Sequence, residues 1–282
     1  MSLVVMRCQP LRLALGNIVR GQVLIQLNDH IATLSHVMFS TDDVAEWSGV
    51  YQWLQIAASI ESVSLDTIKY NNSFGWCSPS DEFDLARDKL LPTFAEKLAI
   101  FNFVWGALES TIDIVKPPKN PDKSKRGKIR DACFWLSSFN RADSIPELLA
   151  ETIMFRELAQ QSIGYERVET RICELKEFGV SGVGLYAVYE LRNLFAHGSM
   201  EFPYPDGENN PVCPEISLVE TATRIVLFSI QLLMLKHFPN PDDYEVFLTT
   251  VTGNIDGDIK LADALRMCHL EVNQLEAQLT LI

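Results

Sequence analysis

Residues 92–118 read P-T-F-A-E-K-L-A-I-F-N-F-V-W-G-A-L-E-S-T-I-D-I-V-K-P-P and carry the clearest helical pattern in the chain. Apolar residues recur in this stretch at alternating spacings of four and three, which places them along one side of an α-helix. They are Phe94, Leu98, Phe101, Trp105, Leu108, Ile112 and Val115. We expect Pro92 to open the helix and Lys116-Pro117-Pro118 to end it, because proline interrupts a helix from within. An apolar stripe of this length predicts that the helix packs against other helices.

Five further helices are predicted between this one and residue 238. They cover about residues 131–139, 144–162, 166–178, 182–197 and 215–238. Ser144-Ile145-Pro146-Glu147 has the spacing of a capping box, with proline in the first turn. The last helix is apolar on nearly every side between Ile225 and Leu235, so we expect it at the centre of the fold. These elements predict a mainly α protein in which residues 88–238 form an up-down helical bundle.

The two flanking regions give weaker patterns. Residues 1–80 are predicted as a mostly helical N-terminal accessory region, although residues 22–27 could equally form a strand. A cap cluster at residues 40–43 predicts a helix to about residue 60, and the alternation over residues 61–72 indicates a short strand. A boundary is expected at residues 71–81, which are rich in Asn, Ser, Gly and Pro. Residues 239–282 are predicted as a small C-terminal appendage of strand, turn and helix.

Composition limits the classes of protein that the chain fits. The 282 residues are 47% hydrophobic, which suffices for a real core, and carry a net charge of −13. This acidity weighs against broad, non-specific nucleic-acid binding. The six cysteines form no C-x-x-C pair, which favours reduced thiols in a cytoplasmic protein. The N-terminus lacks a signal-peptide layout, and the apolar run at residues 225–235 is too short to span a bilayer, so no membrane partner is expected.

A chemically distinctive stretch lies at Tyr186–Ser199, Y-A-V-Y-E-L-R-N-L-F-A-H-G-S. Read as a helix, it has one apolar face, of Ala187, Val188, Leu191, Leu194 and Phe195, and an opposite arc with Tyr186, Glu190, Asn193 and His197. Gly198 is a plausible helix stop. Arg192 and His197 are five positions apart, about 140° around an ideal helix, so the spacing permits a shared site without guaranteeing one.

The segment Arg192-Asn193-Leu194-Phe195-Ala196-His197-Gly198 resembles the R-N-x-x-x-H signature of the HEPN superfamily, small helical bundles widespread in prokaryotic defence and toxin systems. Its context is similar too, because the motif lies on a late helix followed by one more long helix. Glu109, in W-G-A-L-E-S-T, resembles the acidic residue of the family's first helix. The resemblance covers about residues 88–238. It implies a metal-independent endoribonuclease that needs no cofactor, pairs its motifs across a homodimer and acts beside a cognate antitoxin.

The chemistry of RNA cleavage fits these residue types. Attack by the 2′-hydroxyl needs a base for its proton, an acid for the leaving 5′-oxygen and cations around the crowded phosphate. Histidine is suited to acid and base work near neutral pH, and arginine grips phosphate with a planar fork. Asn193 can hold the imidazole or donate to a phosphate oxygen. One histidine cannot readily serve as acid and base in the same step, whereas a two-fold dimer supplies two.

Other interpretations of the same residues stay open. The basic segment 116–130 is either a solvated loop or an RNA-docking surface, for which the candidates are Lys123, Lys125, Arg126 and Lys128. Arg192 and His197 could simply cap a solvated helix end, and Glu109 could be an ordinary exposed acid. The second functional hypothesis is a catalytically silent HEPN-like bundle that binds a partner protein or a nucleotide; the overall acidity favours it.

No metal site is predicted. His30 and His36 are six positions apart, which is poor ligand spacing, and His237 and His269 are isolated in the sequence.

Overall fold

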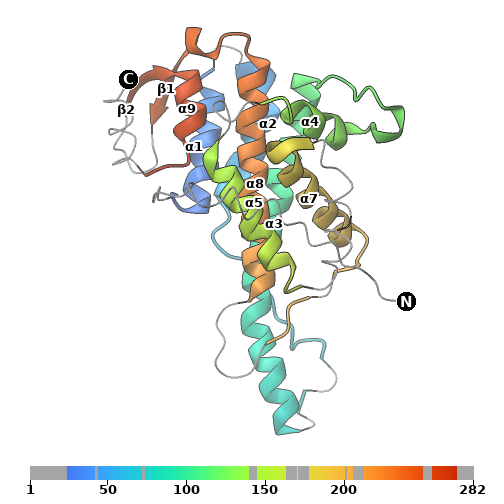
Figure 1. Cartoon of the computed structure of the whole chain (residues 1–282). Helices are drawn as coiled ribbons and strands as arrows, with labels where there is room; N and C mark the ends of the chain where they lie inside the picture. Colours follow the sequence, from blue (N-terminus) through green and yellow to red (C-terminus); the bar gives the residue numbers. More distant parts are fainter. Residues whose placement is uncertain are drawn as a thin grey trace, which may run out of the picture.

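The computed structural model describes residues 24–41, 44–71, 74–75, 77–139, 145–162, 170, 178–200, 202–205, 213–249 and 256–271. Within these residues the protein is mainly helical, which confirms the predicted fold class, and its elements are arranged as in Figure 1. The helices are α1 (Leu27–Phe39), α2 (Val44–Ala58), α3 (Ser78–Val115), α4 (Lys128–Leu136), α5 (Pro146–Ala159), α7 (Gly179–Ala196), α8 (Pro214–His237) and α9 (Leu261–Met267). Two 3-10 turns lie at Lys123–Lys125 and Pro241–Asp243, and two strands at β1 (Glu245–Thr249) and β2 (Asp256–Lys260).

Helix α8 is the centre of the core, as its apolar run predicts. Every residue from Ile225 to Leu235 is buried, and α1, α3, α4, α5, α7 and α9 all pack against this helix. By length and composition, α3 and α8 could each cross a membrane, but core helices of soluble proteins pass the same test. The most apolar window of α8 is 89% buried against the rest of the protein, as a core helix requires, and that of α3 is 44% buried.

The three predicted regions share one hydrophobic core. Helix α1 begins at Leu27 and buries Ile31, Leu34 and Met38, so the predicted helix is confirmed from Leu27 on, whereas residues 24–26 are not helical. Its neighbour α2 packs on α3, while α9 packs on α8. Leu24, just before α1, pairs with Leu270 in an isolated antiparallel bridge. The expected boundaries near residues 80 and 239 therefore mark changes in the sequence and not separate cores.

Helix α3 starts at Ser78, so the prediction that Pro92 opens it is wrong. Pro92 lies inside the helix, and the segment before it is still helical although Leu91 is its first buried residue. Pro79 and Asp81 occupy the first turn, where a missing N–H and a negative charge both favour a helix. This polar first third projects beyond the other labelled helices at the lower end of the view (Figure 1).

The strand predicted over residues 61–72 is also wrong, since residues 61–71 form no strand. They lie instead against the projecting part of α3. The backbone N–H and the hydroxyl of Thr67 donate to Asp88 Oδ1, at 2.9 and 2.7 Å, and Asn71 Nδ2 donates to Asp84 Oδ2 at 2.6 Å. Carboxylates of α3 thus satisfy polar groups that a partner strand would otherwise have satisfied.

The C-terminal region contains one strand more than expected. β1 pairs with β2 in an antiparallel ladder that runs from Glu245 opposite Lys260 to Thr249 opposite Asp256. β2 reads D-G-D-I-K, a polar sequence with low strand propensity, so no pattern indicated it. The last two residues of the turn predicted at 253–257 belong to β2, and the others lie outside the described residues. The Ser144 cap and all but residues 170 and 178 of the helix predicted at 166–178 lie outside them too.

The contact between α4 and α7 generates a testable prediction about stability. A Cβ atom at Gly182 would lie 2.3 Å from the carbonyl oxygen of Cys133, because the two helix backbones almost touch there. We expect Gly182→Ala to lower the free energy of unfolding by about 1–3 kcal/mol. Gly49, exposed in α2 with nothing within 4 Å of its added Cβ, is the matched control. Gly49→Ala should raise stability by about 0.5–1 kcal/mol. Urea unfolding followed by circular dichroism measures both, and equal effects would contradict the close approach.

Candidate functional site

Helix α7 ends where the sequence predicts. Gly198 has φ of +62°, a left-handed conformation that favours glycine. The N–H of Ser199 donates to the carbonyl of Leu194 at 2.8 Å, and that of Gly198 to Phe195 at 3.0 Å. These two bonds form a Schellman motif, which satisfies carbonyls that the helix leaves without partners. The motif fixes His197 as the C-cap residue, one position beyond the last helical residue.

The apolar face of α7 anchors this helix end. Ala187, Val188, Leu191 and Leu194 are buried, as predicted. Phe195 is half-buried, and its ring lies 6.4 Å from that of Phe94 and 6.2 Å from that of Phe101 on α3. Burial on one side therefore leaves the other side of the last turn toward solvent.

Two residues expected on the polar arc, Tyr186 and Glu190, are buried instead. The Tyr186 hydroxyl donates to Glu190 Oε1 at 2.7 Å. Arg130 of α4 donates to that hydroxyl at 3.5 Å and places its guanidinium 6.0 Å from the ring. Burial and the Glu190 carboxylate raise the pKa of Tyr186 to about 12. Because α4 covers this side of α7, the expected polar arc reaches solvent only near the end of the helix.

The motif residues themselves reach solvent. His197 is exposed, and Arg192 and Asn193 are partly exposed. Within the described residues, none of these three side chains makes a hydrogen bond or an ion pair with another part of the chain. A guanidinium, a carboxamide and an imidazole thus lie within the last turn and a half of α7 with their polar atoms available to a ligand.

Glu109 does not join this group in a single chain. Its carboxylate accepts a hydrogen bond from Trp105 Nε1 at 2.8 Å, and Trp105 stacks on Tyr189 of α7 at 6.3 Å. Trp105 lies beside Tyr189 while Phe101 lies beside Phe195, so α3 and α7 run in opposite directions. His197 follows Tyr189 by eight positions, about 12 Å along the axis. Glu109 lies further still in the other direction.

The basic residues Lys123, Lys125, Arg126 and Lys128 lie away from the motif as well. Lys128 Nζ is 2.7 Å from the Asp113 carboxylate, near the C-terminal end of α3, and Arg126 Nε donates to the carbonyl of Asn120 at 2.9 Å. Asp113 lies about 24 Å along the helix axes from the level of His197, counted through the Trp105–Tyr189 contact. The basic segment and the motif therefore do not form one patch.

No protein-family model matches the chain, and neither the curated proteins nor the solved structures contain a significant match.

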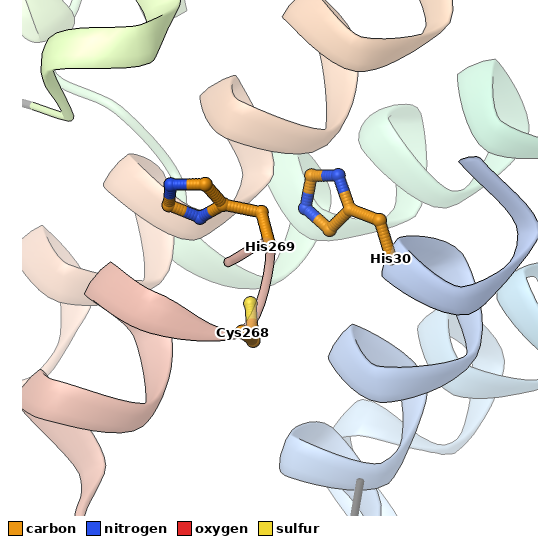
Figure 2. A group of neighbouring side chains, drawn as sticks. All are labelled: His30, Cys268 and His269. Carbon is orange, nitrogen blue, oxygen red and sulfur yellow. The ribbon is translucent and has the colours of Figure 1, made fainter. Parts of the chain in front are cut away.

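A second polar group, which the sequence did not indicate, lies inside the protein. His30, Cys268 and His269 come together beneath the surface (Figure 2). His30 and His269 are far apart in the sequence and lie on opposite flanks of the predicted bundle. One signal was present in the sequence: Gln231, an amide in the middle of the apolar run of α8, needs buried partners.

The helix end itself yields a second prediction. Gly198→Ala should destabilise the protein by about 1 kcal/mol, because the added Cβ meets no neighbour and the whole cost comes from the left-handed backbone. Gly198→Asn should cost less, since asparagine tolerates this conformation better. Thermal unfolding measures both variants. A loss that is equal for alanine and asparagine would argue against the Schellman geometry.

Proposed function

We propose that this protein is a metal-independent endoribonuclease of the HEPN type, acting through Arg192, Asn193 and His197. The observation that supports this most strongly is the exposure of these three side chains at the capped end of α7, without partners in the described chain. A histidine that only capped its own helix end would not need an unpaired arginine and asparagine within the preceding turn and a half. Such a group suits a phosphodiester, which needs a cation and a proton carrier.

The proposed roles follow from the side-chain chemistry. The 2′-oxygen of RNA attacks the adjacent phosphorus, and the bond from phosphorus to the 5′-oxygen breaks. This step leaves a 2′,3′-cyclic phosphate on one product and a 5′-hydroxyl on the other. His197 carries a proton to the leaving oxygen or takes one from the 2′-hydroxyl. Arg192 stabilises the charge on the phosphate oxygens, and Asn193 orients the imidazole or the phosphate.

A second subunit is part of the proposal, because one imidazole supplies one proton-transfer group. Two aromatic side chains just after the motif are more than half exposed: Phe202 at 58% and Tyr204 at 59%. They lie along α3, where Tyr204 contacts Phe83 on the projecting part and Phe202 contacts the buried Phe94 further along the helix. Exposed aromatic surface of this kind is typical of a protein contact. We propose that a homodimer forms through this face, which follows the motif directly in the chain, and that it brings two His197 residues to one phosphodiester.

Glu109 has a different role in this proposal from the one that the resemblance implies. Its hydrogen bond to Trp105 helps to hold the Trp105–Tyr189 stack, and so positions α7 on α3. In this proposal, RNA contacts of the basic residues lie well away from the cleaved bond; these residues are Lys123, Lys125, Arg126 and Lys128. We expect RNA to be the substrate and the protein to act in the cytoplasm beside a neutralising antitoxin.

The first test of this proposal is removal of the imidazole. His197→Ala should lower the rate of RNA cleavage roughly 100- to 10,000-fold, because it removes the proton-transfer group. His36→Ala, which removes another exposed imidazole, on α1, is the matched control and should cut at the wild-type rate. Cleavage of a labelled RNA in the presence of a chelator, with identification of a 2′,3′-cyclic phosphate end, is the measurement. Wild-type protein that cuts no RNA would overturn the proposal.

The alternative is a silent HEPN-like module that binds a partner protein or a nucleotide. The overall acidity and the distance between the basic segment and His197 favour it. Arg192→Lys separates the two functions, because lysine keeps the charge but loses the planar fork. An RNase should lose cleavage with this variant and keep its oligomeric state in analytical ultracentrifugation. A silent module should show no cleavage with any variant.

A further inference from the structure

A chain of hydrogen bonds crosses the interior of the protein near α8. His30 Nε2, on α1, donates to Gln231 Oε1 at 3.0 Å. Gln231 Nε2 donates to the carbonyl of Leu265 and to His269 Nδ1, which lies 3.2 Å away. His269 Nε2 in turn donates to Glu147 Oε2 on α5, at 3.2 Å. These directions are mutually consistent, since an amide oxygen accepts and an amide nitrogen donates. His269 is therefore neutral, because its Nδ1 accepts and its Nε2 donates, and burial lowers the pKa of His30 well below its usual value.

A thiol completes the group. The Sγ atom of Cys268 and one ring nitrogen each of His30 and His269 all lie within 4.8 Å of one another. Figure 2 shows the sulfur beside the two rings, with Cys268 and His269 following α9 and His30 coming from α1. His30 and His269 are 0% exposed and Cys268 is 3% exposed. Two imidazoles and a thiol thus share a space that bulk water does not reach.

We propose that His30, Cys268 and His269 bind one divalent transition-metal ion of the zinc class. Nitrogen and sulfur donors of this kind are the ligands that zinc prefers in proteins. Zinc lies about 2.0–2.3 Å from such atoms, so each ligand atom needs to move inward by only about half an ångström. Small side-chain rotations supply that movement without any change in the helices.

A metal would bind ring nitrogens that now form hydrogen bonds to Gln231. Figure 2 and the bond to Gln231 place Nε2 of His30 toward His269, so a metal would bind through that nitrogen. The ring proton would then lie on His30 Nδ1, which is buried without a hydrogen-bond partner in the described part of the chain. The Gln231 amide, which now bridges the two rings, has an oxygen able to serve as a fourth ligand or to move aside.

Glu147 provides the outer support that such sites have. Metal-bound histidine almost always donates its other ring N–H to a carboxylate, a carbonyl or water, which fixes the tautomer. The bond from His269 Nε2 to Glu147 is of this kind and directs the lone pair of His269 Nδ1 inward. The charges also balance: a divalent ion is offset by one thiolate and one carboxylate. The nearby cation Arg224 donates to the carbonyl of Ile25, and the charges of Glu151 and Glu220 act against the lowering of its pKa by burial.

The consequence of such a site would be structural. Its residues come from α1, α5, α8 and the end of α9, so one ion would tie both ends of the described chain to the central helix. The site is closed and takes nothing from α7, so it is compatible with metal-independent cleavage at His197. The expectation of no metal rested on the poor spacing of His30 and His36 and on His237 and His269 being isolated in the sequence. The fold removes the last of these grounds by placing His269 beside His30.

Cobalt binding to the full chain tests the proposal. The protein is stripped with a chelator, dialysed and titrated with Co²⁺, and a thiolate-to-cobalt charge-transfer band should rise to one equivalent. Cys268→Ser should remove this band and weaken binding more than tenfold. Cys133→Ser, at another fully buried cysteine, is the matched control and should leave the band unchanged. Glu147→Gln should weaken binding about 10- to 100-fold, as loss of an outer partner does.

A second measurement holds even if a variant fails to fold. Zn²⁺ at about 100 times its Kd should raise the Tm of the wild-type chain by about 5 °C or more, and a chelator should reverse the rise. No cobalt band in the wild type, or equal bands in the two serine variants, would overturn the proposal and leave a hydrogen-bond chain alone. None of these readouts depends on RNA cleavage, so the two proposals fail independently.

Discussion

The fold depends on one constraint, which is that α8 must be covered on every side. Its apolar run leaves no face that can remain in water, so neighbouring helices pack around it. Two buried hydroxyls of α8 are satisfied within the helix itself. Thr223 and Ser229 return their hydroxyl protons to carbonyls four residues earlier, at 2.8 and 2.7 Å. Gln231 instead bonds to groups outside α8, and this requirement determines where α1 and the end of α9 dock.

Sequence periodicity predicted the helices in which the pattern of apolar residues alone determines which side is buried. Helices α3, α7 and α8 were expected because their apolar residues repeat over many turns, and the apolar face of α7 is buried as predicted. The sequence pattern did not predict burial where a second helix covers the polar side of the first. Tyr186 and Glu190 look like surface residues in the sequence, yet α4 buries them and Arg130 supplies a partner. That contact depends on where another helix lies, and the spacing of residues within α7 gives no information about this.

In the candidate site too, some residue positions could be predicted from local sequence and others could not. Gly198 ends the helix through its own backbone conformation, so the location of His197 followed from local sequence. The placement of Glu109 did not, because it depends on the direction and register of α3 against α7. Two ring contacts fix both: Trp105 on Tyr189 and Phe101 on Phe195 leave Glu109 well beyond the level of the motif. The acid therefore supports the scaffold of the proposed site without reaching the phosphate.

Surface motifs and interior clusters leave different traces in a sequence. The Arg192–His197 group lies within one helix, so its residues are close in the chain and can be recognised together. The buried group takes His30 and His269 from opposite flanks and is joined only through α8. Its trace in the sequence is Gln231, the single amide in a buried run whose other polar residue, Ser229, bonds within the helix. An amide in such a position indicates that polar partners must arrive from elsewhere in the chain, and buried residues of that kind are where distant ligands are best sought.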